Sequence, residues 1–411
     1  MRVNHSNPGH VRAATIGALC LGGLSGVMAT GLMGPFRDAF VKEYEITQSQ
    51  LGTTLAVIVI VLGFIGIWQG PKLADRIGRY RLLKCSVGMM VIGLTGCGLF
   101  TNLTTLAAFW GLFMLGAYLS IIVNAVVTDL WREEPRRGVL LLHTMLSVGK
   151  ILGPVAAWVC MIYLVQRPWR GFFFFGSAVT LTILVFLSFV RQGKVYHSRE
   201  DHPWQEAPLA RPVLLWLTAA LLGLIAGSEN ALASIAPVFY HQQHDVSHKF
   251  ASWVLAFHFT ALTAGRFLFA AFASKLTCRA IAAISIVPAL LIVPAAYSSS
   301  PVVSIACFVL AGLGFAAMWP AIFAHMAAVF SQNRSRLTLA VGLMNAAGIA
   351  GGIAATSWLI GTRPAVALLF GPAVLILCGL VFVACDRSPA PPADDVPANK
   401  AAPPEDTTRA R

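Results

Sequence analysis

The sequence has few charged residues and little that is not hydrophobic. Charged side chains make up 11% of its 411 residues, whereas about 25% is usual in soluble domains. Hydrophobic residues make up 57%, and the mean hydropathy is +0.73. Such a chain cannot cover a folded core with polar surface, so lipid must act as its solvent. A soluble globular protein is excluded, and an integral membrane protein is indicated.

The sequence also lacks the motifs of enzymes and of ATP-driven pumps. It has no G-x-x-x-x-G-K-[ST] nucleotide loop, no nucleophile motif, no paired carboxylates at a membrane face and no metal-ligand cluster. Its eight cysteines show no zinc-type or disulfide-type spacing and are typical of small packing residues. We therefore expect a protein that is not an enzyme, with no catalytic residue, no metal and no cofactor.

Twelve hydrophobic stretches of roughly membrane-spanning length fill the chain. They predict an all-α membrane protein with twelve transmembrane helices in two six-helix bundles. The expected spans are 13–36, 51–70, 82–100, 105–130, 138–163, 171–190, 213–240, 250–272, 280–297, 302–330, 337–360 and 365–385. The predicted domains are a cytoplasmic N-terminus (1–12), two bundles (13–190 and 213–385), a polar cytoplasmic linker (191–212) and a disordered cytoplasmic tail (386–411).

The positive charge of the chain predicts its orientation. The formal net charge is +13, and most of the 30 Lys and Arg residues fall on alternate connections between the expected spans. This distribution places both termini in the cytoplasm of a multi-pass protein in a bacterial-type plasma (inner) membrane. Since the charge is explained by topology, we expect no nucleic-acid partner. No cleavable signal is recognisable before the first span, so that helix is expected to remain.

The connection after the second span, PKLADRIGRYR, carries the most specific pattern in the chain. Gly78 permits a backbone turn that residues with a Cβ resist. Asp75 is expected to cap the next helix or to pair with Arg79, beside Arg76. Plain positive-inside charge is the alternative explanation for these basic residues.

This D-R-x-G-R order resembles the signature loop of the major facilitator superfamily, although Pro71 stands where that family has Gly. The resemblance covers residues 12 to 385. It implies an alternating-access transporter with a central cavity, with Asp75, Arg76, Gly78 and Arg79 as a gating loop. The segment 271–281 lies 200 positions later and echoes the loop weakly, as expected for two repeated halves.

Three further segments are similar to the fucose/glucose-proton-symporter branch of the superfamily: GVLLLHTMLSVGKILGP, GAYLSIIVNAVVTDLW and GRF. The branch implies a sugar or a similar small polar substrate with proton coupling. Its fucose-type members use acids in the middle of helices one and four. Here Asp38 lies at the outer end of span one, and span four has Asn124, with Asp129 only near its cytoplasmic end. Fucose-type coupling is therefore not carried over.

Lys150 is the most informative polar residue, because a cation near mid-bilayer is costly unless it faces a cavity or a partner. His143 and Ser147 share its helix face. This cationic stripe would bind an anionic substrate or a sugar hydroxyl, or exchange carboxylate partners during transport. The alternative is a structural pair or a lysine that snorkels to the surface.

Glu229 is the acid well inside a helix of the second half, and it is our first choice for a proton carrier. It serves equally well as the fixed counter-ion of Lys150 or Arg266. Arg266 lies nearer the cytoplasmic end, where its side chain can snorkel.

Further pathway candidates are Asn124, Asn230, Asn345 and His258. Amides can read hydroxyl groups, and a histidine can titrate near neutral pH, although interhelical packing explains each alone. Trp253 and Trp319 serve as interfacial anchors or stack on a sugar face.

Glycine and proline positions predict how the helices pack. Gly22 with Gly26, and Gly348 with Gly352, have the small-xxx-small spacing of closely packed helices. Prolines within spans, Pro320 among them, free backbone carbonyls that neighbours or a cavity must satisfy.

Together these features predict a monomeric secondary active transporter of a small polar solute, a sugar or related organic compound, coupled to protons. Gly149 and Gly153 before Pro154 resemble part of an antiporter motif that lacks its trailing glycine pair, so the direction stays open. The alternatives are a proton-driven efflux antiporter for drugs or metabolites and a membrane sensor that does not transport.

Overall fold

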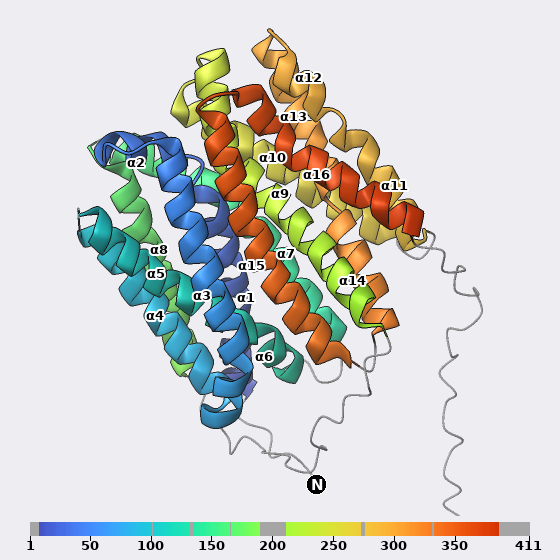
Figure 1. Ribbon diagram of the computed structural model, residues 1–411. Coiled ribbons are helices and arrows are strands. Elements are labelled where there is room, and N and C mark those ends of the chain that lie inside the picture. Colours follow the sequence, from blue (N-terminus) through green and yellow to red (C-terminus); the bar gives the residue numbers. More distant parts are fainter. Residues whose placement is uncertain are drawn as a thin grey trace, which may run out of the picture.

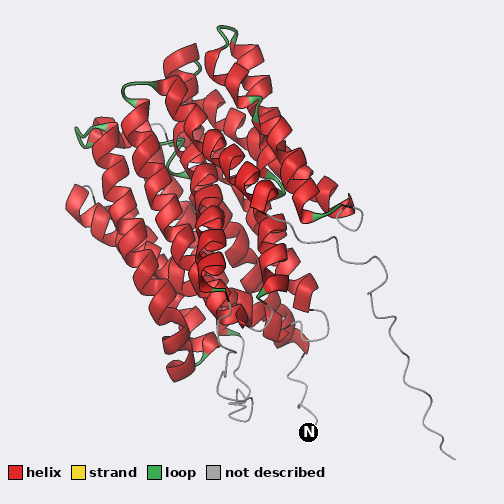
Figure 2. Cartoon of the chain, turned by 45° about the vertical axis from the view of Figure 1, so that its right-hand side comes forward, coloured by secondary structure: helices red, strands yellow, loops and turns green. Residues whose placement is uncertain are grey.

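The protein folds as a bundle of long helices in two halves, seen in the computed structural model (Figure 1). The structure describes residues 8–100, 102–130, 135–164, 166–189, 211–272, 276–330 and 333–385. Within these ranges all regular structure is helical, as Figure 2 shows. Most of the expected linker, the expected tail and the first seven residues lie outside the described residues.

The first half appears in blue to green in Figure 1 and supplies six spans. Two of its elements are short: α2 follows the first span, and α6 extends the fourth through a 3₁₀ turn. The helices are α1 (Pro8–Gly31), α2 (Arg37–Glu43), α3 (Gln48–Ile77), α4 (Arg79–Leu99), α5 (Leu103–Leu119), α6 (Val123–Leu130), α7 (Pro135–Tyr163) and α8 (Pro168–Ser188).

The second half appears in yellow to red and supplies the other six. Its third and fourth spans are each broken into two helices. The helices are α9 (Pro212–His244), α10 (His248–Phe272), α11 (Cys278–Ala289), α12 (Ile292–Tyr297), α13 (Pro301–Phe315), α14 (Met318–Val329), α15 (Arg334–Ile360) and α16 (Pro364–Cys385).

Ten of these twelve segments are long and apolar enough to cross a membrane by length and composition. The other two are α1, whose shorter apolar part is Thr15–Gly31, and α10. Helix α10 carries Lys249 and Arg266, which lower its hydropathy. Helices α1 and α10 nevertheless pack against several other helices of the bundle. The predicted fold class of twelve spans in two six-helix bundles is therefore confirmed.

Two predicted boundaries were wrong. The first span ends at Gly31 rather than at residue 36, because Gly34 and Pro35 follow and the proline has no N–H for a helical bond. The gating segment is also more helical than expected. Helix α3 continues through Pro71 to Ile77, and only Gly78, with φ 88°, separates it from α4.

The two halves repeat each other in the order and spacing of their helices. Helices α3, α4, α5 and α7 begin at residues 48, 79, 103 and 135, and α10, α11, α13 and α15 begin at 248, 278, 301 and 334. The second series therefore follows the first at an offset of about 200 residues. This spacing supports the repeat that the connections at 71–81 and 271–281 suggested.

Close helix pairs stand at equivalent places in the two halves. Helix α1 packs along α7, and α9 packs along α15. A Cβ added at Gly26 would lie 2.2 Å from the carbonyl oxygen of Leu146 in α7, and one at Gly348 would lie 1.9 Å from that of Gly223. Both pairs depend on glycine, so the predicted small-residue packing is confirmed.

Each half has a large hydrophobic core of its own, and the contacts between the halves are smaller. One buried cluster consists mainly of residues from α1 to α8, and another mainly of residues from α9 to α16. The halves meet along two seams, where α3 packs on α15 and α7 packs on α10. Small clusters such as Ile67, Leu343 and Ala346 fill the first seam. This arrangement suits two bodies that move relative to each other.

One end of the bundle is closed by contacts between the halves. We call the end that carries α2 and α12 the upper end, and the end that carries α6 the lower end (Figure 1). At the upper end the fully buried Arg37 donates hydrogen bonds to Ser357 Oγ at 2.6 Å and to Gln48 Oε1 at 2.6 Å. Asp38 Oδ2 lies 3.8 Å from Nδ1 of His248 in the second half. Burial lowers the pKa of Arg37 to about 10, against an opposing effect of Asp38, so the guanidinium is charged at neutral pH.

Candidate functional site

The site is built around an ion pair between Lys150 and Glu229. Lys150 lies near the middle of α7 in the first half, and Glu229 lies near the middle of α9 in the second. Lys150 Nζ donates a hydrogen bond to Glu229 Oε1. The side chains are 12% and 11% exposed. A buried charge at this depth needs a partner, and each residue supplies it for the other across the boundary between the halves.

Arg266 of α10 joins the same carboxylate. Its Nη2 lies 3.9 Å from Glu229 Oε2, and its Nη1 donates a hydrogen bond to Ser147 Oγ on α7. We call Lys150, Glu229, Arg266 and Ser147 the central cluster. The guanidinium is directed toward this cluster, so the alternative in which Arg266 snorkels to the membrane surface was wrong.

A proline holds Arg266 in place through the backbone. Pro320 in α14 has no N–H, so the carbonyl of Ala316 four residues earlier loses its usual helical partner. Arg266 Nε donates to that carbonyl at 3.2 Å. The expectation that proline-freed carbonyls are satisfied by neighbours is thus confirmed at the site itself.

A second proline frees a backbone carbonyl at Lys150, and a neighbouring helix again supplies the donor. Pro154 frees the carbonyl of Lys150, and Thr30 Oγ1 of α1 donates to it at 2.9 Å. The backbone that carries the lysine is therefore tied to the first helix. Phe259 of α10 covers the lysine from the other half, with Nζ 5.9 Å from the ring centre.

The central cluster carries more positive than negative charge. It contains two cations and one carboxylate, so its formal charge is +1 when all three groups are ionised. In a medium of low dielectric such an excess is costly. The arrangement therefore favours an additional anionic group between the halves.

Two histidines lie beside the central cluster. His258 of α10 is buried, and its Nδ1 lies 2.9 Å from the carbonyl oxygen of Phe308. Its Nε2 is buried and has no hydrogen-bond partner within the described part of the chain, and the imidazole interacts electrostatically with Glu229. His143 of α7 is exposed and lies within electrostatic range of Lys150 and Arg266.

The three candidate asparagines lie outside this network. The Nδ2 of Asn124 donates to the carbonyl of Ile121, and that of Asn230 donates to Ala226, so both satisfy their own helices. Asn345 Oδ1 of α15 is buried and has no hydrogen-bond partner among the residues that the structure describes. None has a direct contact with Lys150 or Glu229 among the hydrogen bonds of the described residues.

The gating residues are distant from this site. Asp75 and Arg76 are exposed in the last turn of α3, and Arg79 begins α4. The N-cap of α4 is Gly78, which carries no side chain, so capping of this helix by Asp75 and pairing of Asp75 with Arg79 stay predictions. The positive φ of Gly78 confirms the turn that the sequence predicted.

Sequence reasoning did not single out Arg37, Thr30 or Phe259. Arg37 joins α2 to Ser357 of α15, two residues separated by 320 positions. Thr30 and Phe259 look like ordinary span residues until their helices are packed. A signal for Thr30 existed in Pro154, because a proline within a helix requires a donor for the carbonyl that it frees.

Comparison with known proteins identifies the family. The chain matches the sequence model of the Major Facilitator Superfamily over residues 19–238 and 218–409. It therefore belongs to the major facilitator superfamily, as the loop at 71–81 predicted. Since that family consists of transporters, the chain is a multi-pass membrane transporter.

Among individual proteins the similarity is partial in sequence. The niacin transporter NiaP of Acinetobacter baylyi is 25% identical over 182 residues, which are 43% of this chain and 40% of that protein. The multidrug resistance protein MdtG of Proteus mirabilis is 28% identical over 167 residues, 39% of this chain and 40% of that protein. The chain thus matches about two fifths of the length of these relatives.

Solved structures share the fold over nearly the whole chain. The D-xylose-proton symporter has a TM-score of 0.75 at 15% identity, with 91% of this chain and 96% of that chain covered. The nucleoside transporter NupG has a TM-score of 0.68 at 13% identity, with 92% and 100% covered. At such low identity these likenesses establish the fold alone.

Proposed function

We propose that this protein is a secondary active transporter that moves a small organic anion by alternating access, coupled to protons. The observation that carries the proposal is the central cluster, in which two cations and one carboxylate from both halves meet near mid-membrane. Positive-inside charge further supports a lower end that faces the cytoplasm of a bacterial-type inner membrane. We expect the protein to act as a monomer.

The charge balance favours an anion over a neutral sugar. A carboxylate solute can take the place of Glu229 as the anionic partner of Lys150 and Arg266 once Glu229 is protonated, whereas a sugar would leave the two cations without an anion. Similarity to a niacin transporter is consistent with this class, because niacin is a small aromatic carboxylic acid. A sugar substrate, our expectation from the sequence, derives only from family resemblance.

Glu229 provides a simple basis for coupling to protons. A solute carboxylate competes with Glu229 for Lys150 and Arg266, and a proton on Glu229 releases both cations to the solute. The site then holds two cations and one anion, as it did when it was empty. Binding of an anion together with one proton leaves the formal charge between the halves unchanged, which avoids an extra cost in the low-dielectric interior.

Proton-driven export is the second candidate, and similarity to a multidrug resistance protein favours it. A cationic drug would meet a site that already carries excess positive charge. Export of an anionic metabolite is compatible with the same geometry. The two directions differ in the sign of the pH gradient that drives accumulation.

Uptake into proteoliposomes tests the proposal. Nicotinate, nicotinamide and D-xylose form an informative panel, because the first two differ chiefly in charge. We expect nicotinate, or another monocarboxylate of a wider panel, to accumulate under an imposed pH gradient while its neutral amide does not. Transport of D-xylose with no transport of any anion would contradict the proposed substrate class.

Variants then test the residues. Glu229→Gln should abolish accumulation driven by the gradient while exchange between equal concentrations persists. Lys150→Ala should weaken solute binding about tenfold or more, the size expected for a lost charge-assisted hydrogen bond. Arg363→Gln is the matched control, since Arg363 is an exposed cation in the connection between α15 and α16 and is not part of the central cluster. Normal accumulation by Glu229→Gln would remove Glu229 as the proton carrier.

A further inference from the structure

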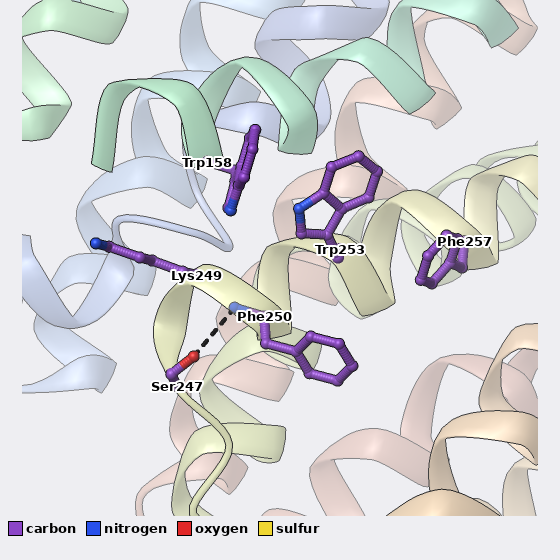
Figure 3. Close-up of a pocket in the computed structure, with 6 residues that line it drawn as sticks. All are labelled: Trp158, Ser247, Lys249, Phe250, Trp253 and Phe257. Carbon is purple, nitrogen blue, oxygen red and sulfur yellow. Dashed lines mark hydrogen bonds between the residues drawn. The ribbon is translucent and has the colours of Figure 1, made fainter. Parts of the chain in front are cut away.

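A second site lies on the seam between α7 and α10 (Figure 3), near the end of α7 and the start of α10, and its lining contains no residue of the central cluster. It is an open groove with a volume of about 490 Å³. We call it the aromatic groove, and it is lined by Trp158, Ser247, Lys249, Phe250, Trp253 and Phe257. Figure 3 shows Trp158 on α7 facing the residues of α10.

The aromatic groove bridges the two halves of the protein. Trp158 belongs to the first half and Trp253 to the second, and their rings meet edge to face with centres 5.3 Å apart. This contact lies on one of the two seams along which the halves pack. Any opening of the upper end along this seam must separate the two rings.

The groove opens on the outer surface of the bundle. Phe250 and Phe257 are 49% and 45% exposed. Because the chain is an integral membrane protein, this surface faces the bilayer. Acyl chains are therefore the neighbours that the aromatic rings contact.

One end of the groove is basic. Lys249 lies in the first turn of α10 and is exposed, and no carboxylate lines the groove. No ion pair of Lys249 is found within the described ranges. Ser247 lies beside it, with its Oγ 3.3 Å from the backbone N of Phe250. A lysine and a hydroxyl above a wall of aromatic rings match a phosphate headgroup above its acyl chains.

We propose that the aromatic groove binds an anionic phospholipid of the leaflet at the upper end. The phosphate lies on Lys249 and Ser247, and the acyl chains lie along Trp158, Trp253 and Phe257. Because one molecule contacts both halves, it stabilises the state in which the upper end is closed. The inference does not depend on the identity of the transported solute.

Quenching of tryptophan fluorescence by brominated lipid tests the binding. The full-length protein is reconstituted in phosphatidylcholine and titrated with brominated phosphatidylglycerol or brominated phosphatidylcholine. We expect stronger quenching by phosphatidylglycerol, and loss of this preference in Trp158→Phe/Trp253→Phe.

Lys249→Gln should lower the apparent affinity for phosphatidylglycerol about fivefold, which corresponds to about 1 kcal/mol for one lysine near a lipid surface. Lys42→Gln is the matched control, because Lys42 is also an exposed lysine at the upper end but lies on α2. Equal quenching by both lipids, an equal effect of Lys42→Gln, or displacement of the lipid by inorganic phosphate would overturn the proposal.

Spin labels at Glu45 and Asp245 test the conformational effect, since these residues follow α2 and α9 at the upper ends of the two halves. Phosphatidylglycerol should shift the distance distribution toward the shorter population, and Lys249→Gln should remove that shift. A distribution that does not respond to the lipid would overturn the stabilising role.

Discussion

Replacement of Glu229 by Gln removes the carboxylate of the central cluster and leaves two cations buried together. Arg266 lies 3.9 Å from that carboxylate, and an ion pair at this separation is worth roughly 4 kcal/mol at an effective dielectric constant of about 20. Loss of one partner from a buried pair costs about 3–5 kcal/mol. The exposed fraction of Arg266, 24%, favours the lower part of that range.

The structure also predicts the order of effects in a double-mutant cycle. Lys150→Met should cost less than Glu229→Gln, because the carboxylate keeps Arg266 as a partner. In the double variant only Arg266 remains, and it keeps its bonds to Ala316 and Ser147. The double variant should therefore recover about 1–3 kcal/mol relative to the sum of the single variants.

The free energy of unfolding, measured by titration with a denaturing detergent in one fixed lipid mixture, provides the assay. Arg363→Gln should change it by no more than about 0.5 kcal/mol, as expected for a surface substitution. If the two single effects simply add, Lys150 and Glu229 are energetically independent, and the reasoning from their contact is refuted.

Three further predictions concern the backbone and the upper end. Gly149→Ala should lower the unfolding temperature by several degrees, because the added Cβ would overlap a backbone oxygen of α1. Gly351→Ala places its Cβ in open space and should leave the unfolding temperature unchanged. Equal effects of the two variants would contradict the close packing. Pro320→Ala should restore a backbone N–H that competes with Arg266 for the carbonyl oxygen of Ala316, and it should raise KM about tenfold at unchanged stability. An unchanged KM would show that this hydrogen bond does not orient the guanidinium. Arg37→Gln should increase the labelling of cysteines at the upper end by a water-soluble reagent, and labelling equal to wild type would argue against Arg37 as a closing contact.

Much of the fold could be predicted because hydropathy and helix breakers act locally. Hydrophobic runs of spanning length predicted twelve segments, and Gly78 marked the turn between α3 and α4 correctly. The errors arose where local signals compete. Pro35 ended the first span early, whereas α3 continues through Pro71 to Ile77, since a membrane-spanning helix can contain a proline.

The candidate site could be predicted in part. Lys150 and Glu229 were found because charges deep in an apolar span are expensive and therefore need a partner or a cavity. The same reasoning offered Glu229 as the counter-ion of Lys150 or of Arg266, but it did not decide between these two or against a separate proton-carrying role. The choice of partner depends on the rotation of α7 and α9 about their axes, and Lys150 and Glu229 are separated by 79 positions.

The sequence by itself determined three properties of this protein. Composition identified a membrane protein, runs of about 20 hydrophobic residues gave the number of spans, and one short loop indicated the family. Only the tertiary structure decided that Glu229 faces both Lys150 and Arg266, that Pro320 frees the carbonyl that holds Arg266, and that Arg37 closes the upper end on Ser357. The physical reason is that a buried charge requires a partner but does not specify which one, and helix packing makes that choice.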